Sequence, residues 1–166
     1  NNASPLFKSL WVTRNKVHNY GAGIAMDMSS PTLRDMLISF NTIDSSEEAR
    51  GAGIYCFLSN PLLENVVISD NVSEVKGYWN FGGGLFCEQS TPVLKNVVIM
   101  NNKLTTSSPG GWFFGGGIFS SYSYLTMTNV QIKGNQLWGY GSGFQGGAGI
   151  FLEYNSNATL TNVLIA

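Results

Sequence analysis

A Gly-x-Gly tripeptide recurs at a nearly constant interval along the chain. It begins at Gly21, Gly51, Gly82, Gly115 and Gly147, so that successive copies lie 30, 31, 33 and 32 residues apart. Internal repeats of this length are typical of solenoids, in which each repeat forms one coil and packs against its neighbours. This spacing constrains the fold more than any other feature of the sequence.

Short apolar runs with strand-like alternation follow each tripeptide, and none of them has helical periodicity. Three runs per repeat predict an all-β parallel β-helix of about five coils, with three strands per coil around a stacked aliphatic core. The first run contributes two inward columns, Ile24, Ile54, Leu85, Ile118 and Ile150, and Met26, Cys56, Cys87, Ser120 and Leu152. The second contributes Phe7, Leu33, Leu63, Leu94, Met127 and Leu160, and the third Val12, Ile38, Ile68, Ile99, Ile132 and Ile165.

Two polar columns accompany the apolar ones, the first between the second and third runs and the other at the end of the third. Asn tolerates left-handed backbone, and Asn side chains stacked about 4.8 Å apart can hydrogen-bond to one another. We therefore predict asparagine ladders, the alternative being that these residues mark solvated turns. The columns are Ser9, Asp35, Asn65, Asn96, Asn129 and Asn162, and Asn15, Asn41, Asn71, Asn102 and Asn135.

Two short motifs recur with the repeat. One is Gly51-Ala52-Gly53-Ile54, also present as Gly82-Gly83-Gly84-Leu85, and the other is Ile68-Ser69-Asp70-Asn71. In this pattern the whole chain resembles the right-handed parallel β-helix of the pectate-lyase-like superfamily. It is also similar to the repeats of polymorphic outer-membrane proteins and other exported bacterial surface β-helices, which carry Gly-Gly-Ala-Ile and Phe-x-x-Asn. The resemblance implies an extracellular or cell-surface location in a bacterium and no particular activity.

Composition excludes several classes of partner. Only 11% of the 166 residues are charged, compared with about 25% in typical globular chains, and the net charge is −1. We therefore expect no nucleic-acid partner, and without a long apolar run we expect no membrane insertion by this segment.

Neither end of the chain shows the polar capping repeat that solenoids normally carry, because the pattern is under way at Pro5 and still apolar at Ile165. We expect 1–166 to be a single β-helix domain from a longer solenoid-containing protein. Uncapped coils also raise the hypothesis of end-to-end self-association.

Segments 16–20, 42–50, 72–81, 103–114 and 136–146 vary in length and are predicted to be loops on one side of the solenoid. Several contain aromatic residues beside an outward aromatic column on the first strand. One interpretation is a glycan-binding groove, because rings offer flat apolar surface; the alternative is that the loop rings fold down and seal the strand face. The candidate ligand-binding residues are Tyr55, Phe86, Phe119, Phe151, Trp79, Trp112, Trp138 and Tyr140.

Asp27, Glu88 and Glu153 are the candidate catalytic carboxylates, two positions beyond the outward aromatic column. Glu88 and Glu153 should lie two coils apart, about 9–10 Å by strand spacing, near the separation in inverting glycosidases. The simpler interpretation is solvated surface charge. Lyases of the resembled superfamily use clustered Asp with calcium and a Lys or Arg base, and no such cluster is present, so we expect no metal or cofactor.

Cys56 and Cys87 fall in one inward column on neighbouring coils. A disulfide and a pair of buried thiols are both compatible with this placement. Strain between adjacent in-register strands favours the thiols.

The leading functional interpretation is a non-enzymatic surface or secreted module, adhesin-like and binding polysaccharide or host cell-surface glycan. The alternatives are a polysaccharide lyase or glycoside hydrolase acting in the same groove, and a structural spacer stalk. Binding without turnover would support the binding module, turnover would support an enzyme, and the absence of both would support the spacer stalk.

Overall fold

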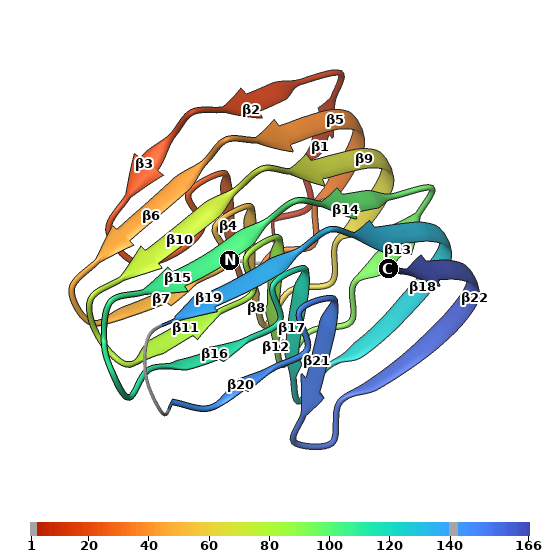
Figure 1. Ribbon diagram of the computed structural model, residues 1–166. Helices are drawn as coiled ribbons and strands as arrows, with labels where there is room; N and C mark the ends of the chain where they lie inside the picture. The colour runs from red at the N-terminus through yellow and green to blue at the C-terminus, as the bar shows by residue number, and fades with distance from the viewer. Residues whose placement is uncertain (1–2, 140–142) are drawn as a thin grey trace.

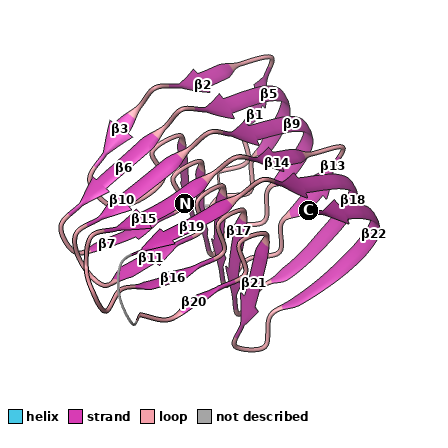
Figure 2. Cartoon of the chain, in the orientation of Figure 1, coloured by secondary structure: helices cyan, strands magenta, loops and turns pink. Residues whose placement is uncertain are grey.

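The computed structural model describes residues 3–139 and 143–166, and within them the chain forms strands and turns with no helix (Figure 2). Strands of successive repeats lie side by side in parallel and stack into four sheets (Figure 1). We name these sheets A to D in the order in which one repeat passes through them. The predicted all-β parallel β-helix is confirmed.

Sheet A holds the longest strands and includes both the second and the third runs predicted from sequence. The two runs of one coil join at a residue with positive φ, such as Asn65 at 56° or Asn96 at 54°, which bends the strand without leaving the sheet. The strands are β1 (Leu6–Lys8), β2 (Trp11–Thr13), β5 (Thr32–Ser39), β9 (Leu62–Ser69), β13 (Val93–Lys95), β14 (Val98–Met100), β18 (Tyr124–Lys133) and β22 (Asn157–Ile165).

Sheets B and C occupy most of the segments that the sequence predicts as loops. Sheet B contains β3 (Lys16–Val17), β6 (Thr42–Ser45), β10 (Val72–Val75), β15 (Lys103–Thr106) and β19 (Gln136–Gly139). Sheet C contains β7 (Glu48–Arg50), β11 (Trp79–Phe81), β16 (Trp112–Phe114) and β20 (Gln145–Gly146). The prediction that these segments are loops is therefore wrong, because most of their residues form the strands of two further sheets.

The physical reason lies in the reversed alternation of β11. Its rings, Trp79 and Phe81, point outward, while polar Asn80 is fully buried. Asn80 accepts a hydrogen bond from the Ser73 hydroxyl at 2.6 Å and donates to the carbonyl of Thr105 at 3.0 Å. A buried amide that has hydrogen-bond partners can stabilise such a strand. The sequence of the strand nevertheless resembles that of a loop, because its inward residue is polar.

Sheet D corresponds to the first run, and the Gly-x-Gly tripeptide forms the corner between sheets C and D. Its strands are β4 (Ile24–Asp27), β8 (Ile54–Phe57), β12 (Leu85–Glu88), β17 (Ile118–Ser121) and β21 (Ile150–Glu153). Gly51 has a φ of 67°, and a Cβ there would lie 2.2 Å from the carbonyl oxygen of Ile54. A Cβ on Gly53 would lie 2.4 Å from the carbonyl oxygen of Gly84 in the next coil. The tripeptide is therefore required by a tight corner and by close packing of coils.

The aliphatic columns form the core as predicted. Ile38, Ile68, Ile99 and Ile132 are in register on neighbouring strands of sheet A and are fully buried. In the outermost coils the same columns are more open, with Phe7 39% and Ile165 50% exposed. Cys56 and Cys87 are in register on β8 and β12 as buried free thiols, in agreement with the favoured interpretation.

A buried asparagine ladder runs along the corner between sheets A and B. Asn71 shows the pattern: its Nδ2 donates to Oδ1 of Asn102 at 2.9 Å and to the carbonyl of Ile38 at 3.0 Å. Its backbone N–H also donates to Oδ1 of Asn102 at 3.1 Å. Each rung donates to the rung of the following coil, from Asn15 through Asn41, Asn71 and Asn102 to Asn135.

An exposed asparagine ladder follows the bend within sheet A and runs in the opposite direction. Asn65 Nδ2 donates to Asp35 Oδ1 at 2.9 Å, and Asn96 Nδ2 donates to Asn65 Oδ1 at 3.0 Å. Asn129 and Asn162 continue the series, each donating to the preceding coil. The prediction of ladders is confirmed, and only one of the two is buried.

Candidate functional site

The outward faces of sheets C and D face each other across the glycine corner. Ring-to-ring contacts close the angle, with 4.8 Å between the centroids of Phe81 and Phe119 and 4.4 Å between those of Phe114 and Phe151. Phe81 and Phe114 come from sheet C, and Phe119 and Phe151 from sheet D. This packing creates a groove on the outside of the solenoid, which we call the C–D groove.

The aromatic column predicted on sheet D forms the floor of the C–D groove. Tyr55, Phe86, Phe119 and Phe151 are in register, and successive centroids lie 5.4, 5.2 and 5.9 Å apart in stacked geometry. Phe86 and Phe119 are only 1% and 3% exposed, so they support the groove from below. These two residues fit the interpretation of a sealed strand face, because the ring of Phe81 packs against Phe119 and the guanidinium of Arg50 lies over Phe86.

Trp79 and Trp112 form one wall of the groove. They are paired in register on β11 and β16, with centroids 5.1 Å apart, and are 44% and 39% exposed. Phe144 extends this row, with its centroid 4.9 Å from that of Trp112. Apolar rings held side by side at the surface can receive the flat face of a ligand.

Arg50 connects the two sheets at one end of the groove. Its Nε contacts the carboxylate of Glu48, and its Nη1 lies 2.9 Å from Oε2 of Glu88 on sheet D. The guanidinium also lies over the rings of Tyr20 and Phe86, 5.8 and 5.2 Å from their centroids. Two carboxylates and two rings thus engage Arg50, the one cation among the described residues that line the groove.

The candidate carboxylates share one column of sheet D but are not all part of the groove. Glu88 and Glu153 are separated by Ser121 and both border the groove, whereas Asp27 lies beyond Phe57 at the far end of the column. Burial raises the pKa of Glu153; the charge of Glu88 adds to this increase, while a hydrogen bond from Ser121 and the charge of Arg50 oppose it. Glu153 has no ion-pair partner in the part of the chain that the structure describes.

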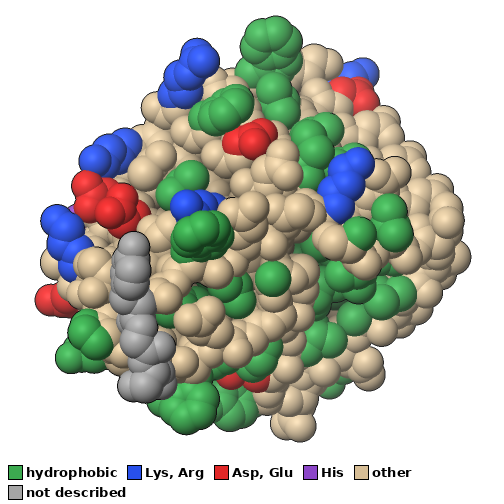
Figure 3. Space-filling view, in the orientation of Figure 1, with side chains coloured by type: hydrophobic (Ala, Val, Ile, Leu, Met, Phe, Trp, Pro, Cys, Tyr) green, Lys and Arg blue, Asp and Glu red, His purple; other side chains and the backbone are tan. Residues whose placement is uncertain are grey.

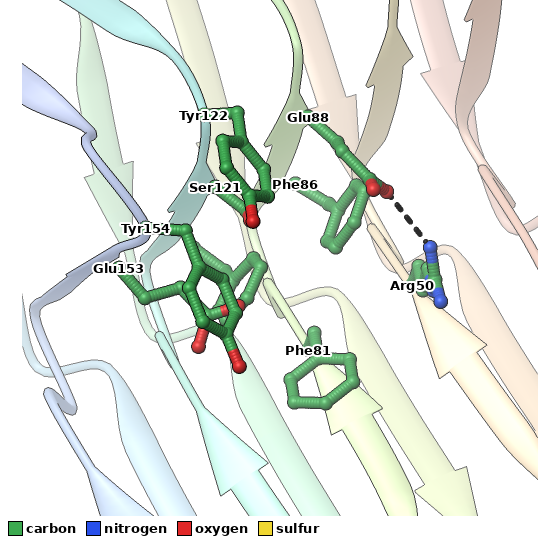
Figure 4. A pocket seen from close by; sticks show the side chains of 9 residues that line it. Arg50, Phe81, Phe86, Glu88, Ser121, Tyr122, Glu153 and Tyr154 are labelled. Atoms are coloured by element: carbon green, nitrogen blue, oxygen red, sulfur yellow. Dashed lines mark hydrogen bonds and ion pairs between the residues drawn. The ribbon is translucent and has the colours of Figure 1, made fainter.

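Two adjoining cavities make up the groove. The larger, about 730 Å³, is lined by Glu48, Arg50, Trp79, Phe81, Trp112, Phe114, Phe151, Glu153 and Tyr154. The smaller, about 140 Å³, lies over Phe86 and Phe119 (Figure 4). In Figure 4, Arg50 and Glu88 lie on one side of it, and Glu153 and Tyr154 on the other. The combined space is typical of a small-molecule site.

Trp138, a predicted ligand-binding residue, lies outside the groove. Trp138 lies on β19 of sheet B, where its Nε1 donates to Gln136 and Lys103 lies 4.8 Å from its ring. Tyr140 lies outside the described residues. Sequence reasoning missed Arg50, Glu48, Tyr122 and Tyr154. Arg50 precedes a corner glycine at the same repeat position as Phe81 and Phe114, and this was the signal that could have indicated its place.

On the face shown in Figure 3, charged side chains are scattered and most of the area is uncharged. Among residues 3–139 and 143–166, no helix is long and apolar enough to cross a membrane.

A parallel β-solenoid with an aromatic groove between two outward sheet faces defines the class of this protein. Residues 4–166 match the family described as right handed beta helix region, and the chain belongs to that family. Neither a search of curated proteins nor a search of solved structures found a match. The family therefore gives the fold, and function has to be argued from the groove.

Proposed function

We propose that this β-helix module binds glycans in the C–D groove. The observation that carries the proposal is the exposed pair Trp79 and Trp112, which stands over a cavity of about 730 Å³ with Glu153 and Tyr154 at its other edge. Sugar rings present apolar faces that stack on aromatic side chains, and their hydroxyls need polar partners at the rim. An extracellular or bacterial cell-surface setting, in an adhesin-like protein, belongs to the same proposal.

A glycan array followed by titration calorimetry tests the proposal with a matched pair of tryptophan variants. Trp112→Ala should weaken binding by about 1–3 kcal/mol, comparable to the loss of a stacking partner in other aromatic platforms. Trp138→Ala removes an exposed tryptophan outside the groove and should leave affinity unchanged. Equal losses in the two variants, or no glycan bound by the parent chain, would reject the proposal.

Glycoside hydrolysis is the second candidate, and the placement of Glu88 and Glu153 favours it. Two strand spacings put their Cα atoms about 9–10 Å apart, and inverting enzymes hold their carboxyl groups about 6.5–9.5 Å apart. Burial raises the pKa of Glu153, which suits a general acid. A lyase is less well supported, because Arg50 is engaged by two carboxylates and is not free to act as a base.

Release of reducing ends from a polysaccharide panel tests this candidate. Turnover that disappears in Glu153→Gln and persists in Asp27→Asn would support hydrolysis. Binding without turnover would leave the non-enzymatic proposal, and the absence of both activities would leave a spacer stalk.

A further inference from the structure

The ionisable groups of the C–D groove are unbalanced in favour of negative charge. Glu48, Glu88 and Glu153 border it, and Arg50 is the one cationic side chain among its described lining residues. The guanidinium is already shared between Glu48 and Glu88. No positive charge is left to receive an acidic sugar, and a uronate would meet uncompensated carboxylates.

Glu153 supplies a carboxylate beside the exposed rings, and among residues 3–139 and 143–166 it has no ion-pair partner. It borders both cavities, together with Tyr154, and it lies on the opposite edge from Trp79 and Trp112. Phe114 and Phe151, stacked at 4.4 Å, lie between these edges. Aromatic faces combined with a carboxylate are the surroundings that attract an ammonium group, through the ring quadrupole and through charge.

Resting on the proposed function, we propose that the glycan carries protonated amines, as in a polymer of deacetylated amino sugars. One sugar ring would lie against Trp79 and Trp112, and another residue of the same oligomer would place its ammonium group beside Glu153, beyond the rings of Phe114 and Phe151. The same charge balance excludes polyuronates from the groove.

The experiment compares three oligosaccharides of equal length by calorimetry, at a pH where amines and carboxylates are both charged. They are β-1,4-linked glucosamine, its fully N-acetylated form, and galacturonate. We expect glucosamine oligomers to bind about tenfold more tightly than the acetylated form, a ratio within the range of one charge-assisted contact between an ammonium group and Glu153, and galacturonate not to bind. Glu153→Gln should abolish the preference for the amine form.

Asp27→Asn is the matched control, because Asp27 belongs to the same column of sheet D but lies outside the groove. An equal loss in this variant would show general attraction of a polycation and overturn the inference. Oligolysine of equal charge that binds as tightly as the glucosamine oligomer would also overturn it.

The failures of the two proposals are distinguishable. Equal binding of amine and acetylated oligomers, abolished by Trp112→Ala, would reject the amine preference and keep glycan binding. Tight binding of galacturonate in the groove would likewise reject the amine preference and keep glycan binding. Absence of binding by every oligosaccharide would reject both.

Discussion

The aromatic row on sheet D and the aromatic row on sheet C are built in the same way and serve different purposes. Each stacks rings of successive coils in register, with the centroids of Phe86 and Phe119 5.2 Å apart in one row and those of Trp79 and Trp112 5.1 Å apart in the other. Rings of Phe81 and Phe119 meet across the glycine corner, so the sheet D row becomes a second core. The tryptophan row remains exposed at the rim. Repetition creates stacks of rings, and corner geometry decides which stack is available to a ligand.

The largest expected effect comes from the covered row. Phe86→Ala should reduce the free energy of unfolding by about 3–5 kcal/mol, because it leaves a cavity beneath Arg50 and beside two stacked rings. Urea denaturation measures the change, and Phe86→Leu, which retains most of the volume, should cost less than about 1.5 kcal/mol. A loss below 1 kcal/mol for the alanine variant would mean that the row is not a core.

A smaller effect is expected from the link between the rows. Arg50→Met should destabilise the protein by about 1–2 kcal/mol, since it leaves the carboxylates of Glu48 and Glu88 facing each other without their shared partner. The loss should diminish at high salt, which screens partly exposed charges. A salt-independent loss would indicate that packing on Tyr20 and Phe86 dominates.

Neighbouring residues of β16 sharpen the comparison within one strand. Trp112→Ala should reduce the free energy of unfolding by about 1 kcal/mol or less, because the outward ring of Trp112 is 39% exposed. Phe113→Ala should reduce it by about 3–5 kcal/mol, because the inward ring of Phe113 is 1% exposed. Thermal and urea unfolding of the two variants give the answer. Similar costs at the two positions would remove the distinction between rim and core.

The smallest effect depends on pH. The folded protein holds the pKa of Glu153 above its unfolded value, so the native state binds the proton more tightly and stability falls as pH rises through that interval. Glu153→Gln should therefore raise the melting temperature near neutral pH and have no effect below the unfolded pKa of about 4.3. A variant that is less stable than the parent at neutral pH would contradict this sign.

Sequence periodicity was sufficient for the interior of the molecule. Residues such as Ile68 and Ile99 recur at fixed positions, and when the coils stack, such an apolar column is buried in the core. The column that contains Glu88 and Glu153 followed from the same alternation. Parity along a strand fixes the side of the sheet to which a residue points.

Parity does not show which other elements cover that side of the sheet. The exposure of the residues in the C–D groove depends on those elements. Phe86 was correctly placed on the outer side of its strand, yet the group that covers its ring is Arg50 of sheet C, whose strands have the composition of loops. The same limit applies to the ladders: Asn96 and Asn102 recur equally well, but only Asn102 is buried. Arg50 was missed because its partner Glu88 comes from sheet D and lies 38 residues away in the sequence.

The direction of the asparagine ladders has a consequence for the chemical ageing of the protein. In the exposed ladder every amide donates to the preceding coil, and the first rung is Asp35, a carboxylate that only accepts. Conversion of any later rung to aspartate by deamidation would remove its donor and place two acceptors against each other. In the buried ladder, an aspartate in place of Asn71 would also face the carbonyl of Ile38 without water to relieve it. Deamidation at a buried rung would therefore destabilise the folded solenoid more than deamidation at an exposed one.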